Sequence, residues 1–116
     1  MSDSLQELRN ALRSFAAERD WDQFHSPRNL ATALAVEAAE LLEPFQWLGE
    51  DAGRELPPAT QAAVVEEMAD VLLYLVRLAD RLDVDLAQAA RSKMARNAEK
   101  YPVEKSRGSS RKYDEL

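Results

Sequence analysis

Apolar side chains recur every three or four residues along most of this sequence, the spacing that places them on one face of an α-helix. Near the N-terminus the repeat runs through Leu5, Leu8, Leu12 and Phe15, and it predicts a helix over about residues 4–19. Only three glycines occur, none inside an apolar segment, while alanine, leucine, glutamate and arginine dominate. Because this composition favours helices throughout, the sequence predicts an all-α fold.

Start and stop signals place three further helices. Ser26 followed by a proline is an N-cap with proline in the first turn, so a second helix is expected from there to about Trp47. After a loop over residues 49–58, the apolar residues that follow Pro58 form too wide a surface for one exposed side, which predicts a third helix at the centre of a bundle. Asp85 begins a sequence that resembles a capping box, and this fourth helix should end near Lys100, before a Tyr-Pro pair.

The length of 116 residues allows one domain, and we expect a helical domain over residues 1–102 followed by a basic, flexible tail over residues 103–116. A chain of this size buries only about 65–70% of its unfolded surface, so oligomerisation would add core. The absence of cysteine excludes disulfides and thiolate metal sites. No apolar run approaches the ~20 residues of a membrane span, and the N-terminus has no apolar signal region, so the expected location is cytoplasmic.

The charges are divided along the chain. Fifteen basic and 21 acidic residues give a net charge of −6, with the acidic side chains concentrated in residues 1–90 and the basic ones in residues 91–112. A general nucleic-acid binder would show a dominant basic surface. The overall balance therefore argues against that class.

Two pairs of acidic residues are the strongest candidates for chemistry, Glu37 with Glu40 and Glu67 with Asp70. The members of each pair are three residues apart and share one helical face, so the two pairs can face each other. Acidic pairs on helices are usually part of a solvated face. Here, however, no other charged residue occurs from residue 30 to residue 42. Because buried unpaired carboxylates cost several kcal/mol each, coordination of a metal ion is the simplest explanation.

The ligand chemistry selects the ion. All-oxygen carboxylate sites suit Mg²⁺, with Mn²⁺ as the alternative, while the single histidine and the absence of cysteine argue against zinc. Protein-bound Mg²⁺ is commonly shared with substrate phosphates, so the cluster points to hydrolysis or transfer at the phosphorus of a phosphate ester or nucleoside phosphate. Glu40 and Glu67 are the candidates for the general base, and Glu43 and Glu66 could take supporting roles.

Aromatic residues supply weaker candidates for substrate contact. Trp21, Trp47 and Tyr74 lie at helix ends or beside the carboxylates, outside the main leucine-rich stripes. Their rings would suit a nucleobase, since stacking contributes roughly 1–3 kcal/mol per base. Core packing is the commoner role of such residues, and both interpretations stay open.

The lone histidine and the basic fourth helix are ambiguous by themselves. His25 precedes the N-cap of the second helix, a position more typical of a loop or capping residue than of a catalyst. Lys93 and Asn97 share one helical face, where an ammonium and an amide could contact phosphate, sugar or base. Basic residues near a helix C-terminus also complement the helix dipole, which is the plainer explanation.

The acidic residues form a recognisable signature. Glu37-x-x-Glu40 followed by Glu67-x-x-Asp70 resembles the ExxE…ExxD pattern of the all-α nucleoside triphosphate pyrophosphohydrolases, the MazG-like superfamily. The wider sequence is similar to the dCTP pyrophosphatase branch over almost the whole chain. The segments that carry this likeness are FAAERDWDQFHSPRNL (15–30), FQW (45–47), GREL (53–56), EEMADVLLYLVRLA (66–79), VDL (84–86), SKM (92–94) and YPVEKSRGSSRKY (101–113).

This resemblance implies a four-helix bundle completed by oligomerisation, in a homotetramer of tight dimers with sites at the subunit interfaces. It implies hydrolysis of dCTP or 5-modified dCTP between the α and β phosphates, giving the monophosphate and pyrophosphate and so cleaning the nucleotide pool. It assigns Mg²⁺ to the four carboxylates of the signature. The residues that it places around the nucleotide are Trp21, His25, Trp47, Tyr74, Lys93 and Asn97.

Two positions depart from the family pattern. Pro44 lies inside the expected second helix, where it removes a backbone donor and crowds the carbonyl of Glu40. We therefore expect a kink or an early helix end next to a metal ligand. Leu12 stands where animal relatives carry a polar residue, so a contact to the base is expected to be missing.

Two alternative functions are compatible with the same residues. One is a pyrophosphohydrolase of broad specificity for nucleoside triphosphates, including dUTP. The other is a helical assembly module without turnover, whose carboxylates bind a structural cation or none. A further hypothesis concerns the basic tail, which could order over the substrate through Lys105, Arg107, Arg111 and Lys112.

Overall fold

A computed structural model describes residues 3–49 and 55–115 of the chain. Within these residues every regular element is a helix and no strand occurs, so the all-α prediction is confirmed. The chain forms two compact units, Met1–Val84 and Asp85–Leu116. No helix in the described ranges is long and apolar enough to cross a membrane.

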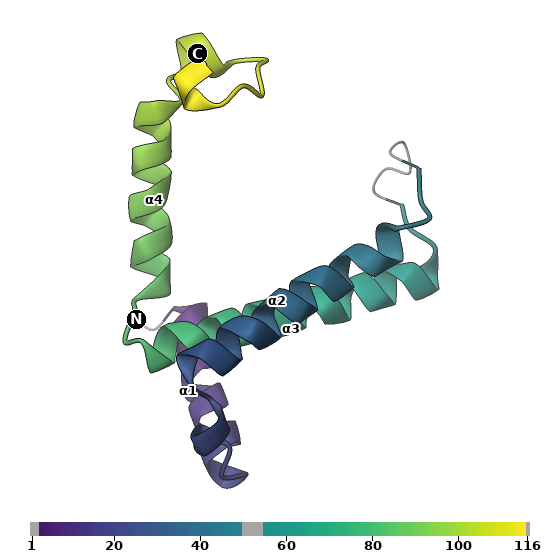
Figure 1. Ribbon diagram of the computed structural model, residues 1–116, viewed down its shortest axis with the longest axis vertical. Helices are drawn as coiled ribbons and strands as arrows, with labels where there is room; N and C mark the ends of the chain where they lie inside the picture. The colour runs from purple at the N-terminus through teal and green to yellow at the C-terminus, as the bar shows by residue number, and fades with distance from the viewer. Residues whose placement is uncertain (1–2, 50–54, 116) are drawn as a thin grey trace. The chain divides into compact units, whose positions relative to one another are not determined.

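The first unit is built around one long helix. Helix α2 lies alongside α3, and α1 packs against α3 as well (Figure 1). The prediction that the third helix is central is therefore confirmed within this unit. Its elements are α1 (Ser4–Glu18), the 3-10 turn η1 (Asp22–Phe24), α2 (Pro27–Leu42), the 3-10 turn η2 (Glu43–Phe45) and α3 (Pro58–Arg81). The expected loop at residues 49–58 lies partly outside the described residues.

Side-chain caps begin the helices where the sequence signals predicted them. The hydroxyl of Ser26 accepts a hydrogen bond from the backbone N–H of Asn29 at 3.1 Å, and a proline occupies the first turn of α2. The carboxylate of Asp85 accepts in the same way from the N–H of Gln88 at 3.0 Å. Both N-cap predictions are confirmed.

Pro44 ends the second helix early, as its chemistry predicts. Helix α2 stops at Leu42, and Glu43–Phe45 continues as a 3-10 turn in which the N–H of Glu43 donates to the carbonyl of Glu40. Proline has no N–H to extend the α-helical pattern, so the chain tightens instead. The expected boundary near Trp47 was therefore wrong, whereas the early helix end was right.

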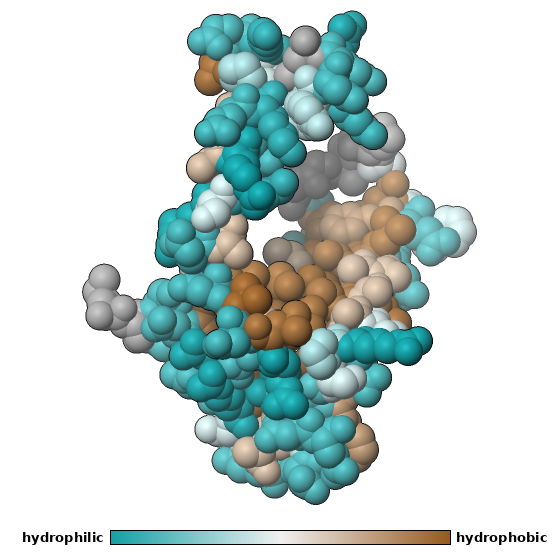
Figure 2. All heavy atoms as spheres, turned by 60° about the vertical axis from the view of Figure 1, so that its left-hand side comes forward, coloured by the Kyte–Doolittle hydropathy of each residue, from teal (hydrophilic) through white to brown (hydrophobic). Residues whose placement is uncertain are grey.

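Only a few apolar side chains are fully buried in the first unit, among them Leu30, which is 2% exposed. Larger apolar residues on α2 and α3 remain exposed, and Figure 2 shows apolar side chains gathered in a continuous brown area. Single exposed apolar residues are ordinary, but a contiguous area of this kind marks an interaction surface. The exposed apolar residues of α2 and α3 are Val36, Leu42, Val65, Met68 and Leu72.

The second unit contains α4 (Leu86–Lys100), the short helix α5 (Val103–Ser106) and the 3-10 turn η4 (Tyr113–Glu115). The ring of Tyr113 packs edge-on against Tyr101 at 6.3 Å, and the ammonium of Lys100 lies 4.8 Å from the centre of the Tyr113 ring. These contacts hold the end of the chain to the end of α4. The expectation of an irregular tail was therefore wrong for residues 103–106 and 113–115, which are helical.

Candidate functional site

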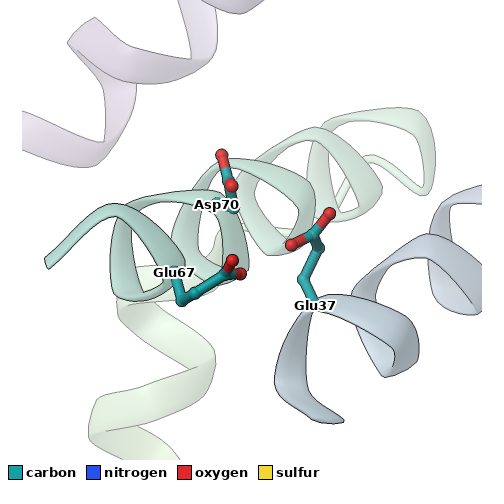
Figure 3. Close-up of side chains that lie close together, drawn as sticks. All are labelled: Glu37, Glu67 and Asp70. Carbon is teal, nitrogen blue, oxygen red and sulfur yellow. The ribbon is translucent and has the colours of Figure 1, made fainter. Parts of the chain in front are cut away.

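Three carboxylates from two helices converge in the first unit. Glu37 projects from α2 toward Glu67 and Asp70 of α3 (Figure 3), and one oxygen of each lies within 4.8 Å of the other two. The spacing of three residues on α3 puts Glu67 and Asp70 on one face, and the side-by-side packing of α2 supplies the third group. The arrangement is that of an all-oxygen cation site.

Two oxygens of this group have no protein partner. The Oε2 atoms of Glu37 and Glu67 are buried, and no donor in the described ranges hydrogen bonds to them. A buried carboxylate oxygen without a donor is costly, and neighbouring carboxylates add repulsion. A bound cation would satisfy both oxygens and cancel the repulsion, so the residues present fit a divalent metal ion.

The acidic neighbours perturb one another's protonation. The nearby carboxyl of Glu67 raises the pKa of Glu37 above its ordinary value, because a proton held between the two carboxyls would form a hydrogen bond. The pKa of Glu40 is raised as well, first by a hydrogen bond with Glu37 and then by the negative charge of Glu37. Without a cation, these two glutamates therefore bind a proton more readily than isolated glutamates do.

Glu40, the fourth predicted ligand, lies one turn beyond Glu37 on the same helix. It interacts with Glu37 but stands outside the three-carboxylate group. The structure thus brings three of the four signature carboxylates together and places the fourth beside them. That position suits either of two roles for Glu40. It can bind the ion directly, or it can act on a molecule that the ion holds.

A cavity of about 170 Å³ adjoins the carboxylates, and Asp70 is part of its wall. Three of the predicted substrate-binding residues, Trp21, His25 and Tyr74, line this cavity. The Trp21 ring packs edge-on against His25 at 6.3 Å and against Phe15 at 5.6 Å. The remaining wall is largely apolar and is formed by Leu12, Phe15, Ala16, Leu30, Leu73 and Arg77.

The turn that carries Trp21 and His25 is built by the end of α1. Asp20 adopts a left-handed backbone conformation (φ 55°), and the N–H of Trp21 reaches back to the carbonyl of Ala16 at 2.9 Å. This is the hydrogen-bond pattern of a helix terminated by one left-handed residue, a conformation that Asp tolerates better than most residues. The terminated helix directs the chain into η1 and so brings Trp21 to the cavity.

Sequence reasoning missed Arg77, although it lines the same cavity. Its side chain is buried on α3, and its guanidinium contacts Asp22, His25 and Asp80. The signal was available, because Arg77 is the one charged residue in the apolar segment VLLYLVRLA. A lone arginine on an apolar helix face needs buried acceptors, which the sequence alone could not locate.

Three further predicted residues lie on other segments of the chain. Trp47 follows η2 and is 87% exposed in the single chain. Lys93 and Asn97 lie on α4, in the second unit, one turn apart on the same face. Their contact with a nucleotide stays a prediction.

The fold and the site define a class, an all-α protein with a carboxylate cation site beside an aromatic-lined cavity. Residues 32–116 match the MazG-like family, and the chain belongs to this family. Membership implies the use of a divalent metal ion, in agreement with the converging carboxylates.

Relatives with known names are similar over nearly the whole chain. It is 52% identical to dCTP pyrophosphatase 1 of Mus musculus and 51% identical to dCTP pyrophosphatase 1 of Homo sapiens. Each match covers 97% of this chain and 68% of the relative. A crystal structure of a pyrophosphatase from Archaeoglobus fulgidus superposes with a TM-score of 0.80 at 40% identity, covering 88% of this chain and 95% of that one.

Proposed function

We propose that this chain is a Mg²⁺-dependent pyrophosphatase that hydrolyses dCTP or 5-modified dCTP to the monophosphate and pyrophosphate. The observation that carries the proposal is the convergence of Glu37, Glu67 and Asp70, with two buried oxygens that lack donors, beside an aromatic cavity. Identity of 50–52% to mammalian dCTP pyrophosphatases over 97% of the chain supports the substrate. Mn²⁺ is the alternative ion, since it accepts the same oxygen ligands.

The three carboxylates would hold the ion, with Glu40 as an additional ligand or neighbour. When bound, Mg²⁺ supplies positive charge that neutralises phosphate oxygens and favours deprotonation of water. The attacking water forms a bond to the α-phosphorus while the bond to the oxygen bridging the α and β phosphates breaks, so pyrophosphate leaves. Glu40 and Glu67 are the candidates to accept the water's proton.

The cavity would receive the nucleoside. Trp21 and Tyr74 offer ring faces and edges, and His25 adds a polar group in an otherwise apolar wall. Because Asp70 belongs both to this wall and to the carboxylate cluster, a base in the cavity leaves its phosphates near the proposed ion. Trp47, Lys93 and Asn97 are proposed as further contacts to the nucleotide.

The exposed apolar residues of α2 and α3 support oligomerisation. Val65, Met68 and Leu72 share one face of α3 at spacings of three and four residues, and all are exposed in the single chain. A second copy of the chain is the proposed occupant, in a homotetramer built from dimers. We retain the division into a helical domain (1–102) and a basic tail (103–116) as part of the proposal.

A panel of nucleotides tests the function directly. Release of pyrophosphate from the four common dNTPs and 5-methyl-dCTP, with and without Mg²⁺, should be fastest for the cytosine nucleotides and should need the ion. The product should be the monophosphate. Release of single phosphates, or turnover that ignores EDTA, would contradict the proposal.

A broader specificity is the second candidate, and one observation favours it. Leu12 lines the cavity and has no polar group to read a base edge. Similar kcat/KM values for dCTP, dUTP and dTTP would establish the broad enzyme. Absence of turnover of every nucleotide, with the carboxylates intact, would instead support the assembly-module alternative.

A further inference from the structure

Arg77 is the most buried charged residue in the described ranges, with 5% of its surface exposed. Each nitrogen of its guanidinium has an acceptor: Nε donates to Nδ1 of His25 at 3.1 Å, Nη2 to Asp22 at 2.5 Å and Nη1 to Asp80 at 3.4 Å. Asp80 is also bound by Arg13 from α1. The Arg77 side chain is therefore held in one geometry by groups from η1 and α3.

The bond from Arg77 determines the tautomer of His25. A guanidinium has five N–H donors and no acceptor, so the Nδ1 atom that receives its bond must carry a lone pair rather than a proton. The proton of the neutral ring then sits on Nε2. Burial and the positive charges of Arg77 and Arg81 lower the pKa of His25, whereas the negative charge of Asp22 raises it. The net effect is a pKa below the ordinary 6.5, so the ring is neutral at pH 7.

The backbone around His25 is held as well. Arg81, one turn after Arg77 on α3, donates from Nε to the carbonyl of His25 at 3.1 Å. Asn29 donates to the carbonyl of Phe24 at 3.0 Å. With Nδ1 and the main chain engaged, Nε2 is the one polar atom of His25 left for a ligand, and no described residue bonds to it.

We propose that Arg77 is a positioning residue: it holds His25 in the single Nε2–H tautomer, so that the cavity presents one fixed hydrogen-bond donor to an acceptor on the nucleoside of the substrate. This inference rests on the proposed function for the identity of the ligand. The acceptor is a carbonyl oxygen or unprotonated ring nitrogen of the base, or an oxygen of the sugar. A donor whose direction is already fixed in the free protein loses less conformational entropy when the ligand binds.

The tautomer can be measured without substrate, because His25 is the only histidine of the chain. In ¹⁵N-labelled protein at pH 7, long-range ¹H–¹⁵N correlation should show Nδ1 as an unprotonated, pyridine-type nitrogen and Nε2 as a protonated one. A ring with the proton on Nδ1, or an imidazolium, would overturn the proposal. Since this readout needs no turnover, it is independent of whether the chain hydrolyses dCTP.

Two arginine variants separate positioning from general electrostatics. Arg77→Met removes the donor to Nδ1, so the ring should exchange between both tautomers and the two nitrogen shifts should move toward each other. Arg81→Met removes an equal charge from the same helix and a contact to the same residue, but it leaves the bond to Nδ1. The control should keep the single tautomer, and loss of the tautomer in both variants would contradict the specific role of Arg77.

The kinetic readout is a split between KM and kcat. Arg77→Met should raise KM for dCTP about twofold, because only the rings that carry the proton on Nε2 can donate to the nucleoside, with a smaller effect on kcat. In a His25→Gln background, whose amide does not change tautomer, the same substitution should raise KM much less. Equal effects in both backgrounds would show that Arg77 does not act through His25. If Arg77→Met fails to fold, the spectrum of the wild-type ring still decides the proposal.

Discussion

Arg13 of α1 and Asp80 of α3 form a two-point ion pair, 2.8 Å from Nε to Oδ2 and 2.6 Å from Nη2 to Oδ1. The residues are 67 positions apart, so the pair fastens the first helix to the end of the third. The side chain of Asp80 is nearly buried, and it also forms an ion pair with the guanidinium of Arg77. Parallel hydrogen bonds between guanidinium and carboxylate are among the stronger polar contacts in proteins.

This pair predicts how stability depends on acid. The hydrogen bond from Arg13 lowers the pKa of Asp80 below its ordinary value of 3.8, because the charged form is favoured in the folded chain. The unfolded chain therefore binds the proton first as the pH falls. The contribution of the pair to the free energy of unfolding is complete above about pH 3.8 and is lost as the pH falls below that value. Urea unfolding from pH 6 to pH 2.5 should show this loss.

Arg13→Met should make the free energy of unfolding less dependent on pH in the acid range, since the pKa of Asp80 is then closer to its ordinary value. Arg9→Met is the matched control, because Arg9 lies one turn earlier on α1 and lowers the pKa of Asp80 through its charge alone, without a two-point pair, so its effect on the acid profile should be smaller. An unchanged acid profile for Arg13→Met would contradict the assignment.

Replacing Glu37 should stabilise the metal-free protein while weakening the response to metal. A raised pKa means that the folded chain holds the proton more tightly, so stability falls as the pH rises above about 4.5 in the absence of a cation. Glu37→Gln removes this penalty, and thermal unfolding in EDTA at pH 7.5 should occur at a higher Tm than for the wild type.

The same variant should lose most of the Tm increase that Mg²⁺ gives the wild type, because one ligand is gone. Glu18→Gln is the control, since Glu18 is exposed on α1 and away from the cluster. A Glu37→Gln protein with unchanged Tm in EDTA and an unchanged response to Mg²⁺ would remove the support for a cation site.

Trp21 should contribute to substrate binding through its ring. Trp21→Ala should raise KM for dCTP by roughly tenfold to a hundredfold, the range for loss of a base-stacking contact, with a smaller change in kcat. The variant Trp47→Ala tests the second predicted tryptophan, which is almost fully exposed in the single chain. A KM change for Trp47→Ala alone would relocate the base to a surface outside the cavity.

Pro44 should control the length of α2. Pro44→Ala restores a backbone N–H that can bond to the carbonyl of Glu40, so the α-helix should extend past Leu42. Hydrogen exchange of the amides of residues 45–47 should then slow relative to the wild type, in which residue 44 has no amide hydrogen. Exchange as fast as in the wild type would mean that the chain after Leu42 is set by other contacts.

Local patterns predicted a large part of the fold. The spacing of leucines, the cap at Ser26 and the cap at Asp85 depend on neighbouring residues, and each corresponds to an observed helix start or face. The helix end before Pro44 also follows from local chemistry, a missing N–H. The short helix α5 was missed because a single helical turn is too short to be signalled by propensity or periodicity.

The candidate site was only half predictable. The pairing of Glu67 with Asp70 on one face follows from helical geometry, and so does that of Glu37 with Glu40. Which of these oxygens come close together depends on how α2 is rotated relative to α3. The group that converges is that of Glu37, Glu67 and Asp70. Likewise, nothing local connects Arg77 with His25, which are 52 positions apart.

By itself the sequence determined the all-α class, the places where the main helices begin and the four acidic residues that carry the family signature, because these follow from periodicity, capping and spacing within one helix. The tertiary structure decided which carboxylates converge and which rings line the cavity. It also decided the tautomer of the only histidine. These properties depend on distances between helices, which are set by packing and by the charge partners of buried Arg77, such as Asp22 and Asp80, rather than by the residues next to each other in the chain.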